Sequence, residues 1–341
     1  MAFVEDAGED LPDASLVAQI DGRDVASDRV FQGNAATDDA VMGVWTLPST
    51  PITQMLSFVA EYEVTASRLQ FDESRARRVE WAAGSWPAAA EAMLEPQEGI
   101  ELSDGARVPD TALSALLSEA TGGRDPKSIG PVQLAKWLAG QIATKLEVSG
   151  VGAVSNDRGQ VVGAGFSSIG LKTYDQTLAD GEGSSFDVCN VLVALYRKAG
   201  LPARLVIAYD AGAEEPGKRN RLFEGDERGA AALRPYVEFA LYDERTDSLG
   251  WVPVDIVALS ERLSTMPQGF LQRPQEGFGT NRELDAIIPL AFAYTPDGST
   301  SSAKAPAFFG LVFQPGIDAP EAQRAVVIDT ATVANRGRRR R

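Results

Sequence analysis

The chain has 341 residues, of which 44% are hydrophobic and 23% are charged, so it can bury a sizeable core and is not a disordered protein. Its 48 acidic and 32 basic residues give a net charge of −16, which argues against a general nucleic-acid-binding surface. A single cysteine excludes an intramolecular disulfide framework, and no apolar run approaches the roughly 18 residues of a membrane span.

The first unit, residues 1–110, is predicted to be a β-rich region. The stretch MLSFVAEYEVTASRLQFDE alternates well enough to indicate one or two strands, and the alanines around Trp86 suit a short helix. Asp38 and Asp39 are adjacent rather than spaced as calcium ligands, so they are interpreted as loop charges. The acidic N-terminal sequence has neither the positive nor the apolar region of a signal peptide, so we expect a protein made in the cytoplasm.

Two helices are predicted next. TALSALLSEATGG, after Asp110, has apolar positions three and four apart and ends in two glycines. GPVQLAKWLAGQIATKLEV begins near Pro131 and places its apolar residues on one broad face. The glycine-rich segment that follows fits neither a dinucleotide fingerprint nor a phosphate loop, so no cofactor is expected.

The stretch GEGSSFDVCNVLVALYRKAGLPARLVIAY, from Gly181 to Tyr209, organises the chain. Ser184 or Ser185 can cap a helix that has almost no polar face and is therefore expected to be buried. Gly200 supplies a left-handed residue after the helix, and Pro202 blocks its continuation. A short apolar strand follows.

This order of a glycine-rich turn, a buried helix and GLPARLVIAY resembles the core of the transglutaminase-like superfamily, whose pattern is a Gly-x-Cys turn, a helix and Gly-Ile-Pro-Ala-Arg before a strand. A second block, RPYVEFALYDERTDSLGWVPVD, is similar to the family's His-Ala-Trp-Val-Glu-Val hairpin followed by Gly-Trp-x-x-x-Asp. The resemblance covers roughly residues 128–257. It implies an α+β fold in which a central buried helix packs on an antiparallel sheet. It says nothing about the two ends of the chain, whose β-rich character is predicted from their own patterns.

The resemblance also implies a catalytic triad, of which two positions differ here. In the family a cysteine at the start of the buried helix is the nucleophile, a histidine on the first hairpin strand is its base, and an aspartate orients the histidine. Counting back from Gly200, the cysteine position holds Ser185. In the second block the histidine position holds Arg234, only Asp255 is kept, and the whole chain contains no histidine. A serine hydroxyl needs a base, which an arginine with a pKa above about 12 cannot be. We therefore expect a pseudoenzyme in which Arg234 and Asp255 form a salt bridge.

Other readings of the same residues stay open. Cys189, one helical turn deeper than Ser185, is interpreted as a small buried hydrophobe, and Ser185 as a helix cap. The alternative is a serine-dependent amidohydrolase or acyltransferase in which Ser185 attacks and Glu182, Asp187 or Asp255 acts as the base. A third reading is a peptide or glycan binder that keeps the old cleft without turnover.

The remaining chain is predicted to hold an exposed polar insertion after Tyr209 and, over residues 263–341, a C-terminal β-rich segment with a basic tail. The segments IIPLAFAYTPDG, APAFFGLVFQPG and RAVVIDTATV are interpreted as its strands. The tail is interpreted as a disordered solubility tail, and any nucleic-acid contact would run through its arginines, Arg338, Arg339, Arg340 and Arg341.

With residues 111–262 as the transglutaminase-like core, the sequence predicts three units and a non-catalytic role. We expect a structural or binding module that meets protein partners in an assembly or a homo-oligomer, with a virion (phage) component as one setting. No cofactor, metal or membrane is expected.

Overall fold

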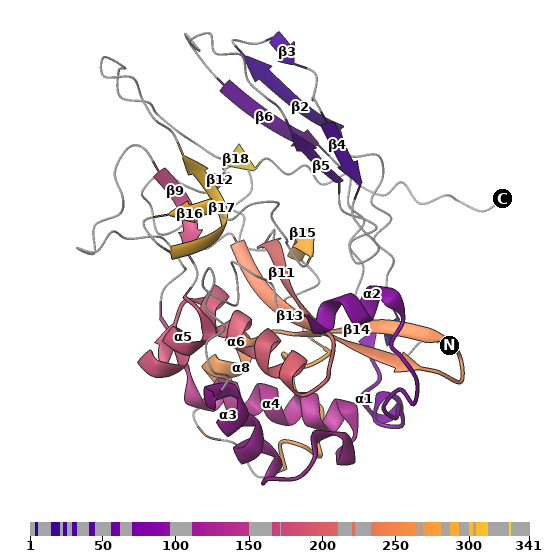
Figure 1. The fold of residues 1–341 in the computed structure, drawn as a ribbon. Helices are drawn as coiled ribbons and strands as arrows, with labels where there is room; N and C mark the ends of the chain where they lie inside the picture. The colour runs from indigo at the N-terminus through magenta and orange to yellow at the C-terminus, as the bar shows by residue number, and fades with distance from the viewer. Residues whose placement is uncertain are drawn as a thin grey trace, which may run out of the picture.

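The computed structural model describes residues 71–95, 111–149, 172–208, 234–263, 265 and 269–280, and gives the backbone of further strands outside these ranges. The chain combines helices with mostly antiparallel strands (Figure 1), so the expected α+β class is confirmed. Asp38 and Asp39, most of the polar insertion after Tyr209, and the tail at 338–341 lie outside the described residues.

The N-terminal region contains the strands expected there. The strand expected in MLSFVAEYEV is β6, which pairs antiparallel with β2, and the helix expected after Trp86 is α2. The elements of this region are β1 (Val4–Glu5), β2 (Ser15–Ile20), β3 (Arg23–Val25), β4 (Arg29–Gln32), β5 (Val41–Val44), β6 (Leu56–Glu61), β7 (Gln70–Phe71), α1 (Glu73–Ala76), α2 (Ala88–Glu91) and η1 (Ala92–Leu94).

Both helices predicted before the glycine-rich segment are present. They are α3 (Thr111–Thr121) and α4 (Pro131–Lys145), with the short η2 (Pro126–Ser128) between them. Gly122 and Gly123, at φ +62° and +74°, end α3, because a residue with a Cβ is strained in that region. Pro131 occupies the first turn of α4, where its missing N–H costs no helical hydrogen bond.

The organising helix is α6 (Ser185–Lys198), preceded by α5 (Tyr174–Asp180). Gly200, at φ +83°, ends α6 in the expected way. The Gly200 N–H donates to the Arg197 carbonyl at 2.9 Å and the Leu201 N–H to the Tyr196 carbonyl at 2.9 Å, the hydrogen-bond pattern of a Schellman motif. This sharp stop turns the chain directly into the next strand.

The central sheet has the strand order β14-β13-β11-β15, and all its neighbours are antiparallel. Its strands are β11 (Ala203–Asp210), β13 (Leu233–Asp243), β14 (Ser248–Val254) and β15 (Ile287–Phe292). After β14 follows α8 (Ile256–Arg262). In Figure 1 the helices α3, α4, α5, α6 and α8 gather on one side of β11 and β13, as the central helix on an antiparallel sheet was expected to do.

The other strands form small pairs and triplets. The three strands expected in the C-terminal segment are present as β15, β17 and β18, and β15 joins the central sheet beside β11. The remaining bounds are β8 (Glu147–Val148), β9 (Phe166–Gly170), β10 (Glu182–Gly183), β12 (Asn220–Arg221), β16 (Thr300–Ser302), β17 (Ala305–Val312) and β18 (Val327–Ile328).

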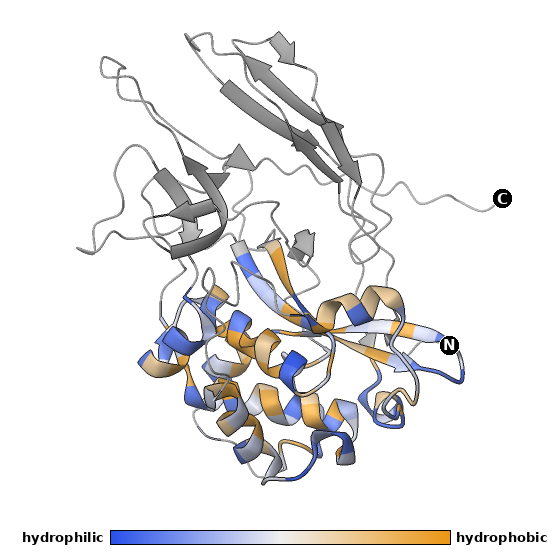
Figure 2. Ribbon diagram, in the orientation of Figure 1, coloured by the Kyte–Doolittle hydropathy of each residue, from blue (hydrophilic) through white to orange (hydrophobic). Residues whose placement is uncertain are grey.

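The core lies where α6 crosses between α4 and the sheet. Every residue from Phe186 to Arg197 is buried, and the hydrophobic residues of α4 and α6 in Figure 2 form part of one cluster with the inner face of β13. That cluster also includes Ala76 and Val79 from before the expected 111–262 core and Phe270 and Phe278 from after it. The flanking segments therefore share the core's packing.

Candidate functional site

The turn before α6 is built around Gly183 and Asp187. A Cβ added to Gly183 would lie 2.8 Å from the Asp187 Cβ and 2.9 Å from the Thr177 Cγ2, so only glycine fits there. The buried Asp187 carboxylate accepts hydrogen bonds from the Ser184 N–H at 2.9 Å and the Lys172 N–H at 2.7 Å. This carboxylate therefore ties the segment before α5 to the first turn of α6.

The cap of α6 is Ser184, whose Oγ accepts from the Asp187 N–H at 3.2 Å in a reciprocal capping box. The interpretation of Ser185 as the cap is wrong, because Ser185 is already the first helical residue. The Ser185 side chain is partly exposed, and within the described residues its hydroxyl takes part in no hydrogen bond. The hydroxyl that the resemblance aligns with the family's cysteine thus has no activating partner in this part of the chain.

Arg234 and Asp255 meet at the end of the central sheet. Arg234 lies near the start of β13, and Asp255 follows β14 and caps α8, its Oδ1 accepting from the Ala258 N–H at 3.0 Å. The Arg234 Nη2 donates to the Asp255 Oδ2 at 2.5 Å, so the expected ion pair is present. The Asp255 side chain is 0% exposed and that of Arg234 19%, so the pair is largely shielded from water.

Cys189 lies fully buried between the two halves of this site. Burial raises the pKa of its thiol well above the ordinary value, and the charges of Asp255 and Asp187 raise it further. The start of α6 lies near the end of β14, because α6 packs against α8, the helix that follows β14. A neutral thiol in such a place is inert, as its interpretation as a buried hydrophobe requires.

A second group of motif residues meets on the sheet itself. Arg204 on β11 and Glu238 on β13 are directly opposite in the strand register, and the Arg204 Nε donates to the Glu238 Oε2 at 2.7 Å. The Arg204 guanidinium also lies 4.1 Å from the ring centroid of Trp251 on β14. We call these three residues the sheet cluster. Sequence reasoning missed their contact, although antiparallel register between the two motif blocks could have placed Arg204 opposite Glu238.

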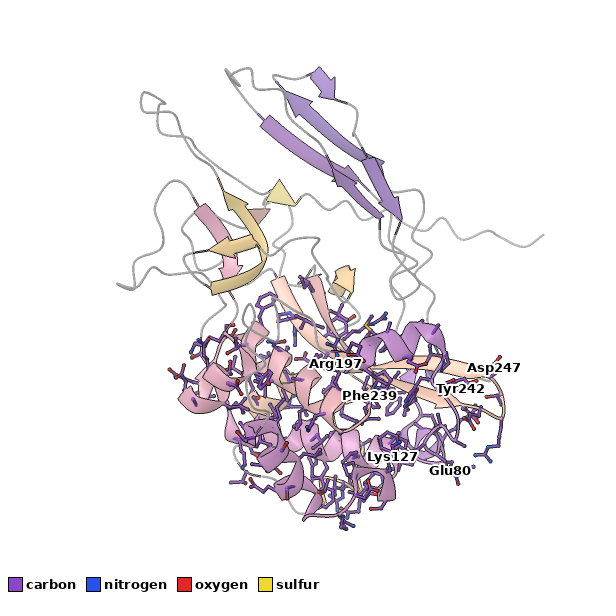
Figure 3. The ribbon with its side chains drawn as sticks, in the orientation of Figure 1. Glu80, Lys127, Arg197, Phe239, Tyr242 and Asp247 are labelled. Atoms are coloured by element: carbon purple, nitrogen blue, oxygen red, sulfur yellow. The ribbon has the colours of Figure 1, made fainter. Side chains whose placement is uncertain are left out.

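A shallow hollow of about 280 Å³ lies elsewhere, against the turn of the β13–β14 hairpin. Its lining residues, none of which is a triad position, are Arg75, Arg78, Val79, Asp243, Arg245 and Thr246. Tyr242 and Asp247, which mark this end of the hairpin in Figure 3, are joined by a hydrogen bond of 2.8 Å, whereas Phe239 lies in the interior. The hollow and the triad positions are thus at opposite ends of the hairpin.

Neither a metal site nor a membrane span is found in the described part of the chain. No group of three or more Cys, Asp or Glu side chains there could hold a metal ion. None of its helices is long and apolar enough to cross a bilayer.

The segment that holds these residues resembles a known protein family. One solved structure, a candidate cysteine protease from Cytophaga hutchinsonii, is 12% identical with a TM-score of 0.43, over 96% of this chain and 83% of that chain. None of the curated proteins compared with the chain matches it. The family model of the transglutaminase-like superfamily matches residues 119–256, which include Ser185, Arg234 and Asp255. The expected resemblance to the transglutaminase-like superfamily is therefore confirmed over these residues.

Proposed function

We propose that this chain is a catalytically inactive transglutaminase-like protein that acts as a structural or binding module in a larger assembly. The observation that carries the proposal is the ion pair between Arg234 and Asp255, with its 2.5 Å contact. A guanidinium stands where the family resemblance implies an imidazole. It binds the carboxylate that would otherwise orient a base, and the chain has no histidine to replace it.

The other carboxylates near Ser185 also favour an inactive site. A base for a serine hydroxyl needs a free oxygen and a raised pKa. Both oxygens of Asp187 accept backbone N–H groups, and those of Asp255 accept from Ala258 and Arg234. These donors occupy the oxygens that would have to accept the serine proton. Glu182, the last of the three candidates, is exposed, and within the described residues no hydrogen bond joins its side chain to Ser185.

Covalent labelling tests the inactive state. The purified protein is incubated with a fluorophosphonate probe, which reacts with activated serines, and the modified residue is located by mass spectrometry. We expect no labelling at Ser185. Labelling that is lost in Ser185→Ala and kept in Ser118→Ala, a control on the exposed face of α3, would instead make the chain a serine hydrolase.

The assembly is tested separately. Light scattering after size-exclusion chromatography is expected to show a mass of several chains, or a complex when the source extract is fractionated. A virion is one such assembly, and in that setting the chain would copurify with particles. A stable monomer that copurifies with nothing would contradict the module role and leave the inactive site as a separate finding.

A further inference from the structure

Lys136 is a charged side chain in the middle of the core. It lies on α4 with 0% of its side chain exposed, next to residues of the same helix that pack against α6 and α8. Burying an ammonium without partners is strongly unfavourable, so its hydrogen bonds must offset much of that cost. Burial lowers the pKa of Lys136, and its bond to Glu73 opposes this shift.

The partners of Lys136 come from two segments that are far apart in the sequence. Its Nζ lies 2.7 Å from the Glu73 Oε1 and donates to the Arg273 carbonyl at 2.5 Å. The rings of Phe270 and Phe278 each lie 5.7 Å from the same nitrogen. One ammonium thus binds a segment before the core and a segment after it.

The two segments also bind each other. Arg77 donates to the Glu73 Oε1 at 2.6 Å and to the Leu271 carbonyl. Phe71 packs so closely on Gly279 that a Cβ there would lie 2.0 Å from the Phe71 Cδ1. The Phe71 and Phe278 rings meet edge to face with centroids 6.2 Å apart. The segments 71–77 and 269–280 therefore form a continuous layer on Lys136, which we call the strap.

The strap reaches one of the triad positions. The Asp255 N–H donates to the Gly277 carbonyl at 2.8 Å, and the Gly279 N–H donates to the Pro253 carbonyl at 2.7 Å. The end of β14 is thus fixed on one side by the strap, while the Asp255 side chain holds Arg234 on the other. Any opening of the strap removes a backbone partner from the residue that anchors the ion pair.

The closed strap leaves one buried hydrogen-bond acceptor unpaired within the described residues. The Glu73 Oε1 serves both Lys136 and Arg77, whereas its Oε2 is buried and accepts no hydrogen bond within the described residues. A buried acceptor without a hydrogen-bond partner costs free energy. The closed strap is therefore less stable than it would be with both Glu73 oxygens paired. This unpaired oxygen favours local opening of the strap, which also requires Phe270 and Phe278 to leave the core cluster.

We propose that Lys136 holds together a two-segment strap, residues 71–77 and 269–280, which opens as one unit and in opening breaks the hydrogen bond from the Asp255 N–H to the Gly277 carbonyl. Without Lys136, Glu73 loses a charge partner and the Arg273 carbonyl loses a donor. Without Glu73, the ammonium keeps one carbonyl only. Either change releases both segments, because each is bound to Lys136 and to the other.

Hydrogen exchange on the full chain tests this in the unmodified protein and in variants. In the unmodified protein, peptides covering 72–79, 274–280 and 253–259 should share one opening rate, while the α6 peptide 188–196 exchanges more slowly. In Lys136→Met the first three should exchange about 100-fold faster, the effect expected from breaking a buried ion pair, with α6 changed by less than about threefold. Lys145→Met on the same helix is the matched control, because its partner Glu119 is exposed and its loss should change none of the four peptides.

Several results would overturn the proposal. One is faster hydrogen exchange in only one of the two segments. Another is equal acceleration in α6, which would mean general destabilisation. A third is different opening rates for the two segments in the unmodified protein. If Lys136→Met does not fold, Glu73→Gln replaces it, because glutamine keeps the side-chain size. This variant must exchange faster in 274–280 as well as in 72–79, although Glu73 itself lies in the first segment.

Discussion

Two sets of residues differ in how they match the family pattern that the sequence resembles. In the sheet cluster, Arg204, Glu238 and Trp251 have the identities that the family pattern has, and they contact one another across β11, β13 and β14. Near the starts of β13 and α6, the resemblance aligns Arg234 and Ser185 with the base and the nucleophile, from which they differ. The comparison indicates that the residues that match the pattern are ones that contact one another across paired strands.

The largest effect is expected from restoring the missing groups. The double substitution Ser185→Cys and Arg234→His places a thiol at the start of α6 and an imidazole beside Asp255. A helix N-terminus and a nearby imidazolium lower a thiol pKa, so iodoacetamide should label position 185 at least about 100-fold faster than buried Cys189 at pH 7. Mass spectrometry distinguishes the two sites, and Ser185→Cys alone is the control. Equal rates in the single and double variants would show that the scaffold no longer aligns the triad positions.

Arg234→Met tests how much the ion pair contributes to the unfolding free energy. It leaves the Asp255 carboxylate buried with one of its charge partners gone, which should cost about 2–4 kcal/mol of unfolding free energy in urea. Replacing both partners, Arg234→Met with Asp255→Asn, should recover part of that loss. A single variant as stable as the unmodified protein would mean that solvent or another group already serves the carboxylate.

The sheet cluster should respond more weakly. Arg204→Met removes a hydrogen-bonded ion pair with buried Glu238 and a contact with the Trp251 ring, so we expect a loss of about 2 kcal/mol. Glu238→Gln and the double variant complete a cycle in urea unfolding, whose coupling energy should be near 1 kcal/mol. No coupling would contradict the view that these motif residues act together.

The smallest expected effect is the contribution of Cys189 to the pH dependence of the unfolding free energy. Its raised pKa means that the folded chain keeps a proton that the unfolded chain releases above the ordinary thiol pKa of about 8.5. The unfolding free energy should therefore fall as pH rises, by about 1 kcal/mol between pH 8.5 and 9.5 for this group. The difference in slope between the unmodified protein and Cys189→Ala isolates it from buried Tyr196, whose pKa is also raised. Equal slopes would indicate that the thiolate forms in the folded state.

Much of the fold could be predicted because its signals are local. The stop of α6 at Gly200, the helix α4 after Pro131 and the strands β15 and β17 follow from short patterns, and each is present. The ion pair of Arg234 and Asp255 was predicted from charge, although Asp255 lies just after β14 as the cap of α8 and not on a strand.

Other features could not be predicted because they depend on distant parts of the chain. Nothing near Lys136 in the sequence indicates that Glu73 and Arg273 bind it, since these contacts need the folded core to exist first. The choice of Ser184 over Ser185 as the cap is made by the capping box with Asp187, three residues after Ser184, a signal present in the sequence that the prediction did not use. The boundaries at 110 and 262 stay a prediction, although the packing of residues 71–79 and 270–278 into the core favours a longer folded unit.

The order of the Lys136 partners along the chain has a consequence for synthesis. Glu73 is made before Lys136 and Arg273 is made 137 residues after it. At a translation rate of about 5–20 residues per second, roughly 7–27 s pass between the synthesis of Lys136 and that of Arg273. During that interval a nascent chain has a cation, a single carboxylate and an uncovered apolar surface. Lys136 cannot be fully buried in its final environment until nearly the whole core has been translated.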